Sequence, residues 1–193
     1  MSISTDKLMH FVIGAVTGWS YWIFLDRYAK TGIRYLNPLI FLLGVIWGAS
    51  GLFFFRQLQV PILEGQFFYM AIPDWDLPLY KITKFSFLLH RSWLFHSVLL
   101  PVGLLTMSLI GMSQKQIFTI SSWLRDAAIA LCVGISAHLI WDALLSETKR
   151  GFFIRGWSHS DSLIWLAVNL AIGFGLPLIC LKSLRETQPK ELD

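Results

Sequence analysis

The sequence predicts an all-α integral membrane protein in which about five transmembrane helices form a bundle. Three observations carry this prediction. The chain has 193 residues, of which 55% are hydrophobic and 15% are charged, whereas charged residues make up about 25% of an average soluble domain. Its mean hydropathy is +0.59. Five apolar runs, each close to the roughly 20 residues that cross a bilayer, are more than one soluble core of this size would bury.

The predicted spans divide the chain into membrane-crossing helices and connections. Their approximate ranges are 8–25, 37–55, 93–112, 127–145 and 163–181. We expect a single membrane-embedded helical domain over residues 1–182, followed by a polar C-terminal tail over residues 183–193. The first run has no small-residue cleavage site, so we expect a retained anchor and not a signal peptide. The sequence therefore predicts a multi-pass membrane protein.

Small residues recur at helical spacing in the first two spans. Gly14 and Gly18 lie in the first span, and Gly44 and Gly48 repeat the same spacing in the second. A small residue at every fourth position lets the backbone of another helix approach closely. We therefore expect both pairs to lie at helix–helix contacts.

The connection between the second and third spans, residues 56–92, is too long to be a simple link. Its middle, QFFYMAIP (66–73), is apolar but too short to cross a bilayer, which predicts an interfacial or re-entrant segment. The proline that ends this run disfavours helix, and in an extended chain Asp74 and Asp76 would point to the same side. Residues 81–89 are expected to form a short amphipathic helix along the membrane surface.

Ionisable groups are concentrated between residues 72 and 97 and in the fourth span. The members of the first group are Asp74, Asp76, His90 and His96. His138 and Asp142 in HLIWD are four residues apart, which places both side chains on one face of a helix. If the five spans alternate in direction, all of these groups share one face of the bilayer with His10, at the entrance of the first span.

The two ionisable residues of the fourth span need a compensating partner. A charged group inside a span costs about 2.5 to 3.5 kcal/mol on insertion scales. Imidazole and carboxylate are the usual ligands of zinc, manganese or iron where no thiolate is supplied, and neighbouring ions share bridging carboxylates. Such a centre activates water and holds a phosphoryl oxygen. Arg91 is suited to bind the phosphate in the bidentate manner that a guanidinium favours.

Four sequence blocks resemble a known family. The blocks are LMHFVIGAVTG, IPDWD, HRSWLFHS and AHLIWDALL, in this order and among hydrophobic spans. They resemble the YdjM-type family of predicted membrane-bound metal-dependent hydrolases, which is thought to be distantly related to zinc-dependent phospholipase C. The blocks spread over residues 8–145, so the resemblance covers most of the chain but not its last span.

The resemblance implies a set of functional residues. The implied metal ligands are His10, Asp74, Asp76, His96, His138 and Asp142. His90 and Arg91 match the family's H-R pair and are the implied catalytic residues. The family usually separates its two histidines by four residues, whereas five intervene here, so it stays open whether His90 or His96 is the ligand. The implied cofactor is a divalent metal, with zinc favoured over manganese or iron.

The favoured function is hydrolysis of a phosphoester by metal-activated water. A lipid or lipid-linked substrate suits a site at the membrane surface, and membrane lipid is the expected partner. No nucleic acid is expected, because the net charge of +4 is modest and no basic stripe is present. The alternative is a non-catalytic membrane protein in which a metal or polar network staples the helices and the loops bind a partner. Haem ligation by paired histidines is a third class, which the neighbouring carboxylates disfavour.

Each motif also has an ordinary structural interpretation. PDWD alone is typical of a turn with two solvated carboxylates, and HLIWD alone is typical of a hydrogen bond that packs a helix. Arg91 is equally suited to anchor a lipid phosphate. His159 and Asp161 have no match in the family, which favours an ordinary polar loop there.

Overall fold

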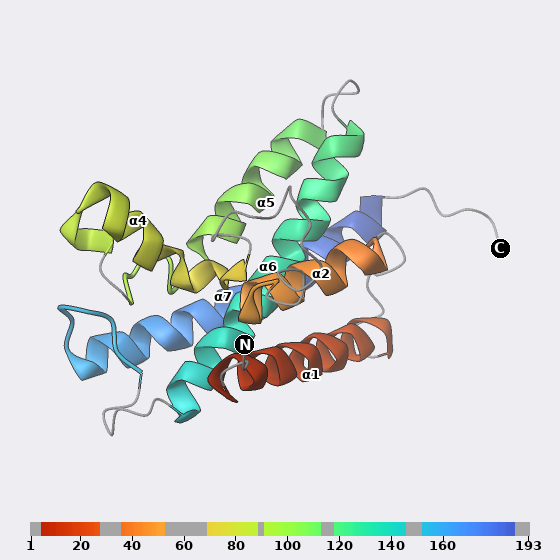
Figure 1. The fold of residues 1–193 in the computed structure, drawn as a ribbon. Helices are drawn as coiled ribbons and strands as arrows, with labels where there is room; N and C mark the ends of the chain where they lie inside the picture. Colours follow the sequence, from red (N-terminus) through yellow and green to blue (C-terminus); the bar gives the residue numbers. More distant parts are fainter. Residues whose placement is uncertain are drawn as a thin grey trace, which may run out of the picture.

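The computed structural model describes six stretches of the chain, and the regular structure within them is helical throughout (Figure 1). These stretches are residues 5–27, 36–52, 69–88, 91–112, 118–145 and 152–187. The α-helices are α1 (Thr5–Arg27), α2 (Pro38–Ser50), α4 (Asp76–Thr83), α5 (Leu99–Met112), α6 (Phe118–Leu145) and α7 (His159–Thr187). Short 3-10 helices, η4 (Ile72–Trp75) and η5 (Ser86–Leu88), flank α4. The prediction of an all-α fold is confirmed.

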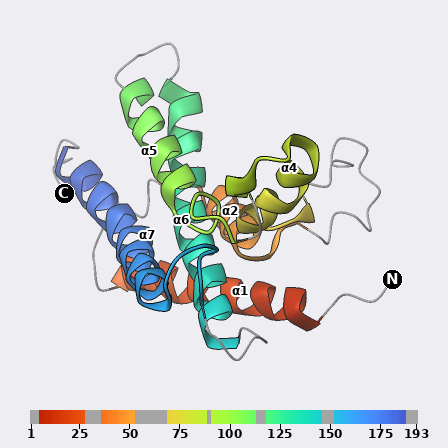
Figure 2. The same cartoon turned by 90° about the vertical axis from the view of Figure 1, so that its left-hand side faces the viewer.

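Helix α6 is the central element of the fold. It contacts α1, α2, α5 and α7, which surround it in both views (Figures 1 and 2). The side chains of α6 from Ala128 to Ile135 are almost completely buried. A helix that is apolar on every side is stable where other helices cover it. The core of the described residues is therefore built around this one helix.

Three helices of the described chain are long and apolar enough to cross a membrane. They cover Thr5–Arg27, Phe118–Leu144 and His159–Ser183, within α1, α6 and α7. Helices α2 and α5 have 13 and 14 residues, which correspond to about 20 Å of helix against a hydrocarbon core of roughly 30 Å. Three of the five predicted spans are therefore long enough to cross a membrane, which indicates a membrane protein.

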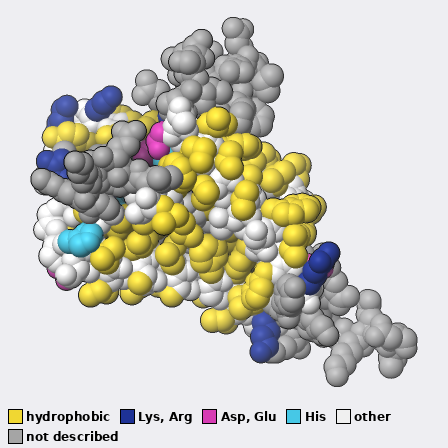
Figure 3. Space-filling view, turned by 90° about the horizontal axis from the view of Figure 1, so that it is seen from below, with side chains coloured by type: hydrophobic (Ala, Val, Ile, Leu, Met, Phe, Trp, Pro, Cys, Tyr) yellow, Lys and Arg dark blue, Asp and Glu magenta, His cyan; other side chains and the backbone are white. Residues whose placement is uncertain are grey.

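The surface of the described residues agrees with a membrane environment. Seen from below, hydrophobic side chains cover most of the visible face, and Lys and Arg lie toward its ends (Figure 3). Val16, Trp19, Ile164 and Ile179 are between 58% and 69% exposed. Apolar surfaces of this extent are rare on soluble monomers and mark regions that contact a membrane or a partner.

Helix α6 begins at Phe118, well before the predicted start of the fourth span at residue 127. It continues through two adjacent charged residues because they neutralise each other. Arg125 Nη2 lies 2.6 Å from Asp126 Oδ1, and both side chains are buried. Asp126 Oδ2 accepts a hydrogen bond of 2.9 Å from the backbone N–H of Asn37, just before α2. Charges that the sequence places in a connection therefore tie α6 to α2.

Helix α5 begins at Leu99, later than the predicted start of the third span at residue 93. Residues 91–98 instead form an irregular segment, in which a side chain of another helix replaces a helical hydrogen bond. The backbone N–H of Val98 donates to Asn169 Oδ1 on α7 at 2.8 Å. At the other end of the chain, α7 continues to Thr187 and includes the first residues of the predicted polar tail.

The segment around Pro73 is helical, so the prediction of an extended chain there is wrong. The 3-10 helix η4 contains Pro73, and α4 follows directly at Asp76. Proline is compatible with the first turn of a helix, because the N–H that it lacks would have no partner there. Both Pro73 and Pro78 lie in such a first turn. The two carboxylates of PDWD are therefore positioned by helices and not by a strand.

Helix α4 lies earlier in the chain than the predicted surface helix over residues 81–89. It ends at Thr83, and Lys84 follows with a left-handed φ of 59°. Phe85 and Phe87 are 56% and 53% exposed, and their rings are stacked with centroids 5.5 Å apart. Figure 1 shows α4 pointing away from the other helices.

The glycine pairs lie at helix–helix contacts, as predicted. A Cβ atom at Gly14 would overlap Ala49, so α1 and α2 touch at this position. A Cβ atom at Gly48 would lie 3.0 Å from the backbone nitrogen of Ile135 on α6. A Cβ atom at Gly44 would overlap the Ala130 side chain of the same helix. The close approach at these glycines brings α1, α2 and α6 together.

Candidate metal centre

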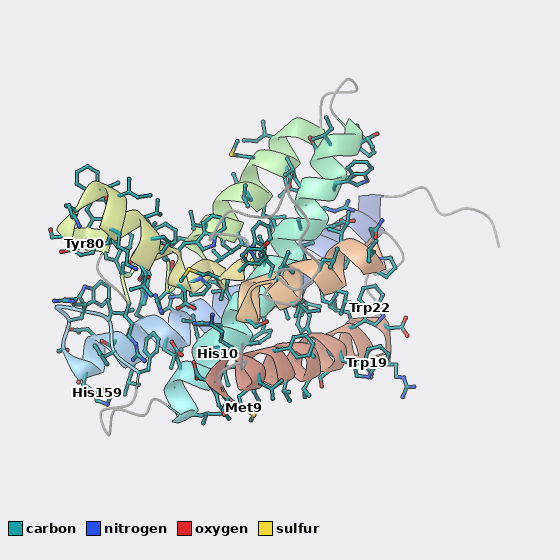
Figure 4. All side chains as sticks on the ribbon, in the orientation of Figure 1. Met9, His10, Trp19, Trp22, Tyr80 and His159 are labelled. Atoms are coloured by element: carbon teal, nitrogen blue, oxygen red, sulfur yellow. The ribbon has the colours of Figure 1, made fainter. Side chains whose placement is uncertain are left out.

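The predicted ligands on the long helices meet between the start of α1 and the end of α6. His138 and Asp142 are one turn apart on α6, as their spacing predicts. His10 and His138 are 7% and 2% exposed, and their ring centroids are 4.3 Å apart. Figure 4 shows His10 on the side of α1 that faces the rest of the fold, and Met9 on the outer side.

The Asp142 carboxylate is the centre of the cluster, because imidazole nitrogens from three segments face it. His10 Nε2 lies 3.3 Å from Asp142 Oδ1. His138 Nε2 and His96 Nε2 lie 3.6 Å and 3.9 Å from Asp142 Oδ2. His96 is fully buried and belongs to the irregular segment before α5. His10 and Asp142 are 132 positions apart in the sequence, so the tertiary fold builds this arrangement.

Backbone carbonyls hold the far side of two of these rings. His10 Nδ1 lies 3.0 Å from the carbonyl oxygen of Asp6, and His138 Nδ1 lies 2.8 Å from that of Ala49. A carbonyl oxygen can only accept, so Nδ1 of each ring carries a proton. Nε2 of His10 is within hydrogen-bond distance of Asp142 Oδ1 and donates to it when the ring is protonated. When the ring is neutral, the lone pair of Nε2 can bind a cation. This orientation is typical of histidines that bind a metal through Nε2.

Asp74 joins the same cluster from η4. The Asp74 carboxylate, His96 and His138 offer ligand atoms within 4.8 Å of one another, and so do His10, His138 and Asp142. Because His138 belongs to both groups, the two groups form one continuous set of donors. Imidazole nitrogens and carboxylate oxygens in this number are a fitting ligand set for zinc, manganese or iron.

A glycine at the end of α2 brings the Asp74 segment to the cluster. Gly51 has a φ of 77°, a left-handed conformation that favours glycine. A Cβ atom at Gly51 would overlap the backbone of Tyr69 and Met70, so the chain passes closely over the end of α2. The next element, η4, contacts both α2 and α6. The approach at Gly51 therefore sets where Asp74 enters the site.

Asp76 reaches the cluster through His96. Neither side chain has exposed surface, and Asp76 Oδ2 lies 3.4 Å from His96 Nδ1. The same carboxylate oxygen accepts a hydrogen bond of 3.1 Å from the backbone N–H of Ser92. Asp76 thus lies on the opposite side of the His96 ring from Asp142.

Arg91 lies next to this cluster. Its guanidinium carbon is 4.6 Å from the centroid of the Phe153 ring, and its positive charge is close enough to Asp142 to attract that carboxylate. Within the part of the chain that the structure describes, Arg91 Nη1 is buried and has no hydrogen-bond partner. The other residue of the predicted catalytic pair, His90, lies outside the described residues.

His159 and Asp161 do not join the cluster and belong to the first turn of α7. Asp161 Oδ2 accepts a hydrogen bond of 2.6 Å from Ser158 Oγ, which caps the helix. His10 and His159 are well separated in Figure 4. The structural interpretation of these two residues therefore agrees with the geometry, although they start a helix and do not form a loop.

The groups that orient the histidines carry little signal in the sequence. The carbonyl of Ala49 and the N–H of Ser92 belong to the backbone, so no residue type marks them. The carbonyl of Asp6 is more accessible to prediction, because it lies four residues before His10 on the same helix. Of these three orienting groups, only the carbonyl of Asp6 could thus be predicted from its position in the sequence.

Comparison with known proteins does not identify a function for the cluster, so its interpretation depends on its geometry. No protein-family model, curated protein or solved structure matches the chain. The resemblance to the YdjM-type family therefore stays a hypothesis, carried by four sequence blocks.

Proposed function

We propose that this protein is a membrane-bound metal-dependent hydrolase of phosphoesters, with zinc as the favoured ion and manganese or iron as alternatives. The observation that carries the proposal is the Asp142 carboxylate with three imidazole nitrogens within 3.9 Å of it. In this role the chain would be a member of the YdjM-type family that its sequence blocks resemble.

The chemistry of the donors supports a cation at this position. When the rings are neutral, Nε2 of His10 and Nε2 of His138 both offer a lone pair beside the Asp142 carboxylate, so the three groups together favour a positive ion between them. Asp74 and His96 extend the donor set. A divalent ion held there would activate a water molecule and polarise a phosphoryl oxygen.

Arg91 would bind the substrate phosphate. Its Nη1 is buried and has no hydrogen-bond partner among the described residues, while Phe153 supports the guanidinium from one side. A guanidinium can donate two parallel hydrogen bonds to a phosphate, and such charge-assisted bonds are stronger than neutral ones. Arg91 would orient the phosphoester beside Asp142, and His90 would assist as the neighbouring member of the H-R pair.

A lipid or lipid-linked substrate fits the surroundings of the site. The helices that carry His10 and Asp142 are both long and apolar enough to cross a membrane. Leu8, Val12 and Val16 expose 39% to 58% of their surface on the outer side of α1. A substrate with acyl chains could therefore stay in the bilayer while its phosphate reaches the cluster.

The proposed topology has five spans and an interfacial segment between the second and third. Helices α2 and α5 would be the two additional spans, because both are strongly apolar and both pack along α6. Helix α4 with η5 would be the interfacial segment, with Phe85 and Phe87 toward lipid. Labelling of single cysteines from each side of sealed vesicles tests whether these helices cross, with cysteines introduced at residues 37 and 52 for the two ends of α2 and at residues 99 and 112 for the two ends of α5.

Metal analysis and activity together test the proposed function. We expect the detergent-purified protein to hold at least one equivalent of a transition metal and to hydrolyse a fluorescent phospholipid or a nitrophenyl phosphoester. Chelation should abolish hydrolysis and zinc should restore it. Asp142→Asn and His138→Gln should lose metal and activity, whereas His159→Gln, outside the cluster, should retain both.

Two results would contradict the proposal in different ways. Less than about one equivalent of metal, with full activity in Asp142→Asn, would exclude the metal mechanism. Bound metal without hydrolysis of any phosphoester, together with loss of thermal stability in the variants, would favour the non-catalytic alternative. In that case the cluster connects α1 and α6 and has a structural role.

A further inference from the structure

The three histidines of the cluster share one pattern of contacts. Each has an oxygen near Nδ1 and presents Nε2 to Asp142. For His10 and His138 the oxygen at Nδ1 is a backbone carbonyl, and for His96 it is Oδ2 of Asp76. Asp76 therefore occupies the position that a carbonyl occupies beside the other two rings.

We propose that Asp76 is a positioning residue, which orients His96 for ligation through Nε2, and that it is not itself a metal ligand. This inference rests on the proposed function, because it concerns the same cluster. It changes the role that the sequence resemblance implies for Asp76. It leaves Asp74 as the ligand of the PDWD block.

The contacts of Asp76 support this assignment. Oδ2 faces Nδ1 of His96 and also accepts the backbone N–H of Ser92, so this oxygen is engaged by the segment that carries the histidine. Nδ1 and Nε2 are at different edges of the imidazole, which places Asp76 and Asp142 on different sides of the ring. Among the described residues, the groups of donors within 4.8 Å of one another include Asp74 but not Asp76.

A carboxylate at Nδ1 has a stronger effect than a carbonyl. A negatively charged acceptor fixes the tautomer and raises the basicity of Nε2, and loss of such a partner typically costs about 10- to 100-fold in metal affinity. His96 has such a partner in Asp76, and both groups are completely buried. Asp6 Oδ1 also lies 3.6 Å from Nδ1 of His10, but the Asp6 side chain is 66% exposed, so water screens its charge. We expect the affinity of the centre to depend on Asp76 although the number of bound ions does not.

The test compares the same chemical change at two positions that are two residues apart. Asp76→Asn and Asp74→Asn each remove one negative charge and keep a side-chain oxygen. Zinc binding to the full-length purified protein is measured by equilibrium dialysis, and the ligand field is measured from the absorption spectrum of the cobalt-loaded protein. Asp76→Asn should bind the wild-type number of ions with about 10- to 100-fold lower affinity and with unchanged cobalt band positions. Asp74→Asn should lose an ion or shift the bands.

A measurement on the wild-type protein makes the inference independent of how the variants fold. Nitrogen-15 NMR of histidine-labelled, zinc-loaded protein reports which ring nitrogen binds the metal, with His96→Gln used to assign the signal. We expect Nε2 of His96 to be bound and Nδ1 to carry a proton. Binding through Nδ1 would overturn the inference.

The outcomes separate this inference from the proposed function. If the wild type binds metal and Asp76→Asn loses an ion as Asp74→Asn does, Asp76 is a ligand and only the inference fails. If the wild type binds no zinc, manganese or iron, the proposed function and the inference both fail.

Discussion

Arg91 has a backbone conformation that few residues other than glycine adopt. Its φ is 65°, and strained conformations of this kind cost on the order of 1–3 kcal/mol and occur often at functional sites. Two contacts hold it: the Arg91 carbonyl accepts a hydrogen bond of 3.3 Å from the backbone N–H of Arg155, and the next residue, Ser92, donates to Asp76. These contacts therefore fix the backbone from which the Arg91 side chain extends.

Substitution of Arg91 by lysine tests its role in substrate binding. Arg91→Lys keeps the positive charge but not the two parallel donors, and a hydrogen bond to a charged group contributes about 1.5–3 kcal/mol. We expect unchanged metal content and a kcat/KM for phosphoester hydrolysis that is lower by about 10- to 100-fold. The exposed Arg155 provides the control, because Arg155→Lys should change neither quantity.

Two other results would show that Arg91 does not bind the substrate. Unchanged hydrolysis in Arg91→Lys would indicate an anchor to lipid phosphate. A loss of bound metal would indicate that the residue supports the cluster structurally.

The residue types of the site could be predicted from the sequence, but their orientation could not. The spacing of His138 and Asp142 places both on one face of α6, since this relation is local to one helix. The meeting of His10 with Asp142 depends on how α1 packs against α6, which no local pattern encodes. The role of Asp76 depends on which nitrogen of His96 faces it, a property of the tertiary structure alone.

At the scale of elements, the close contact between α2 and α6 depends on Gly134, which has no side chain. A Cβ atom at Gly134 would overlap the carbonyl oxygen of Val45. We expect Gly134→Ala to destabilise the protein by about 1–3 kcal/mol, because overpacking outweighs the higher helix propensity of alanine. Thermal unfolding in detergent, followed by circular dichroism, measures the effect.

Gly103 on α5 is the matched control for this substitution. A Cβ atom there would meet nothing within 4 Å, so Gly103→Ala should be neutral or stabilising by up to about 1 kcal/mol. Equal stability of Gly134→Ala and Gly103→Ala would show that α2 and α6 can separate without cost.

The turn at Gly51 links the end of α2 to the candidate metal centre. Gly51→Ala should lower metal affinity, because its Cβ would displace the backbone at Tyr69 and Met70, which leads into η4 and Asp74. Gly156 also has a left-handed φ, of 82°, but a Cβ there would meet nothing within 4 Å. Gly156→Ala therefore has the backbone strain without the overlap and should keep wild-type zinc binding in equilibrium dialysis.

A second outcome would assign the effect to backbone strain. If Gly51→Ala and Gly156→Ala reduced zinc affinity equally, the overlap at the end of α2 would not be the cause.

The ends of the elements were harder to predict than their existence. Hydropathy identifies the apolar runs, but it counts every charge as unfavourable, and so it misses the start of α6, where Arg125 and Asp126 neutralise each other. Proline at residue 73 indicates an extended chain when only its effect on the preceding residue is considered. In the first turn of η4 the same residue is compatible with helix.

At the scale of the whole molecule, the cluster connects segments from distant parts of the sequence. Its residues come from α1, from η4, from the segment before α5 and from α6. A ligand that binds only the folded state stabilises it by about 2.7 kcal/mol when its concentration is 100 times Kd. Metal bound here should therefore stabilise the entire fold and not one helix.

Removal of the metal tests this coupling. We expect a chelator to lower the Tm of the wild-type protein in detergent by roughly 5–10 °C, since each kcal/mol corresponds to about 2–4 °C for a chain of this size. His159→Gln should show the same decrease. Asp142→Asn should already be destabilised and should not respond to the chelator. A wild-type protein that loses its metal without any change in Tm would contradict the coupling.

The membrane character of the protein follows from length and composition, but the number of spans does not. Helices α1, α6 and α7 are long enough to cross a membrane, whereas α2 and α5 are shorter than the apolar runs that contain them. A side chain accepts the hydrogen bond of Val98 just before α5, and Gly51 ends α2. Such specific contacts decide where a helix stops inside an apolar run.

The buried pair of Arg125 and Asp126 has a consequence for motion. Asp126 ties one end of α6 to the start of α2, and Asp142 ties the other end to α1. If α6 slid along its axis by one turn, about 5.4 Å, it would break both attachments at once. These two attachments therefore oppose a piston movement of α6, and we expect the cluster to open by movement of the peripheral segments around this helix.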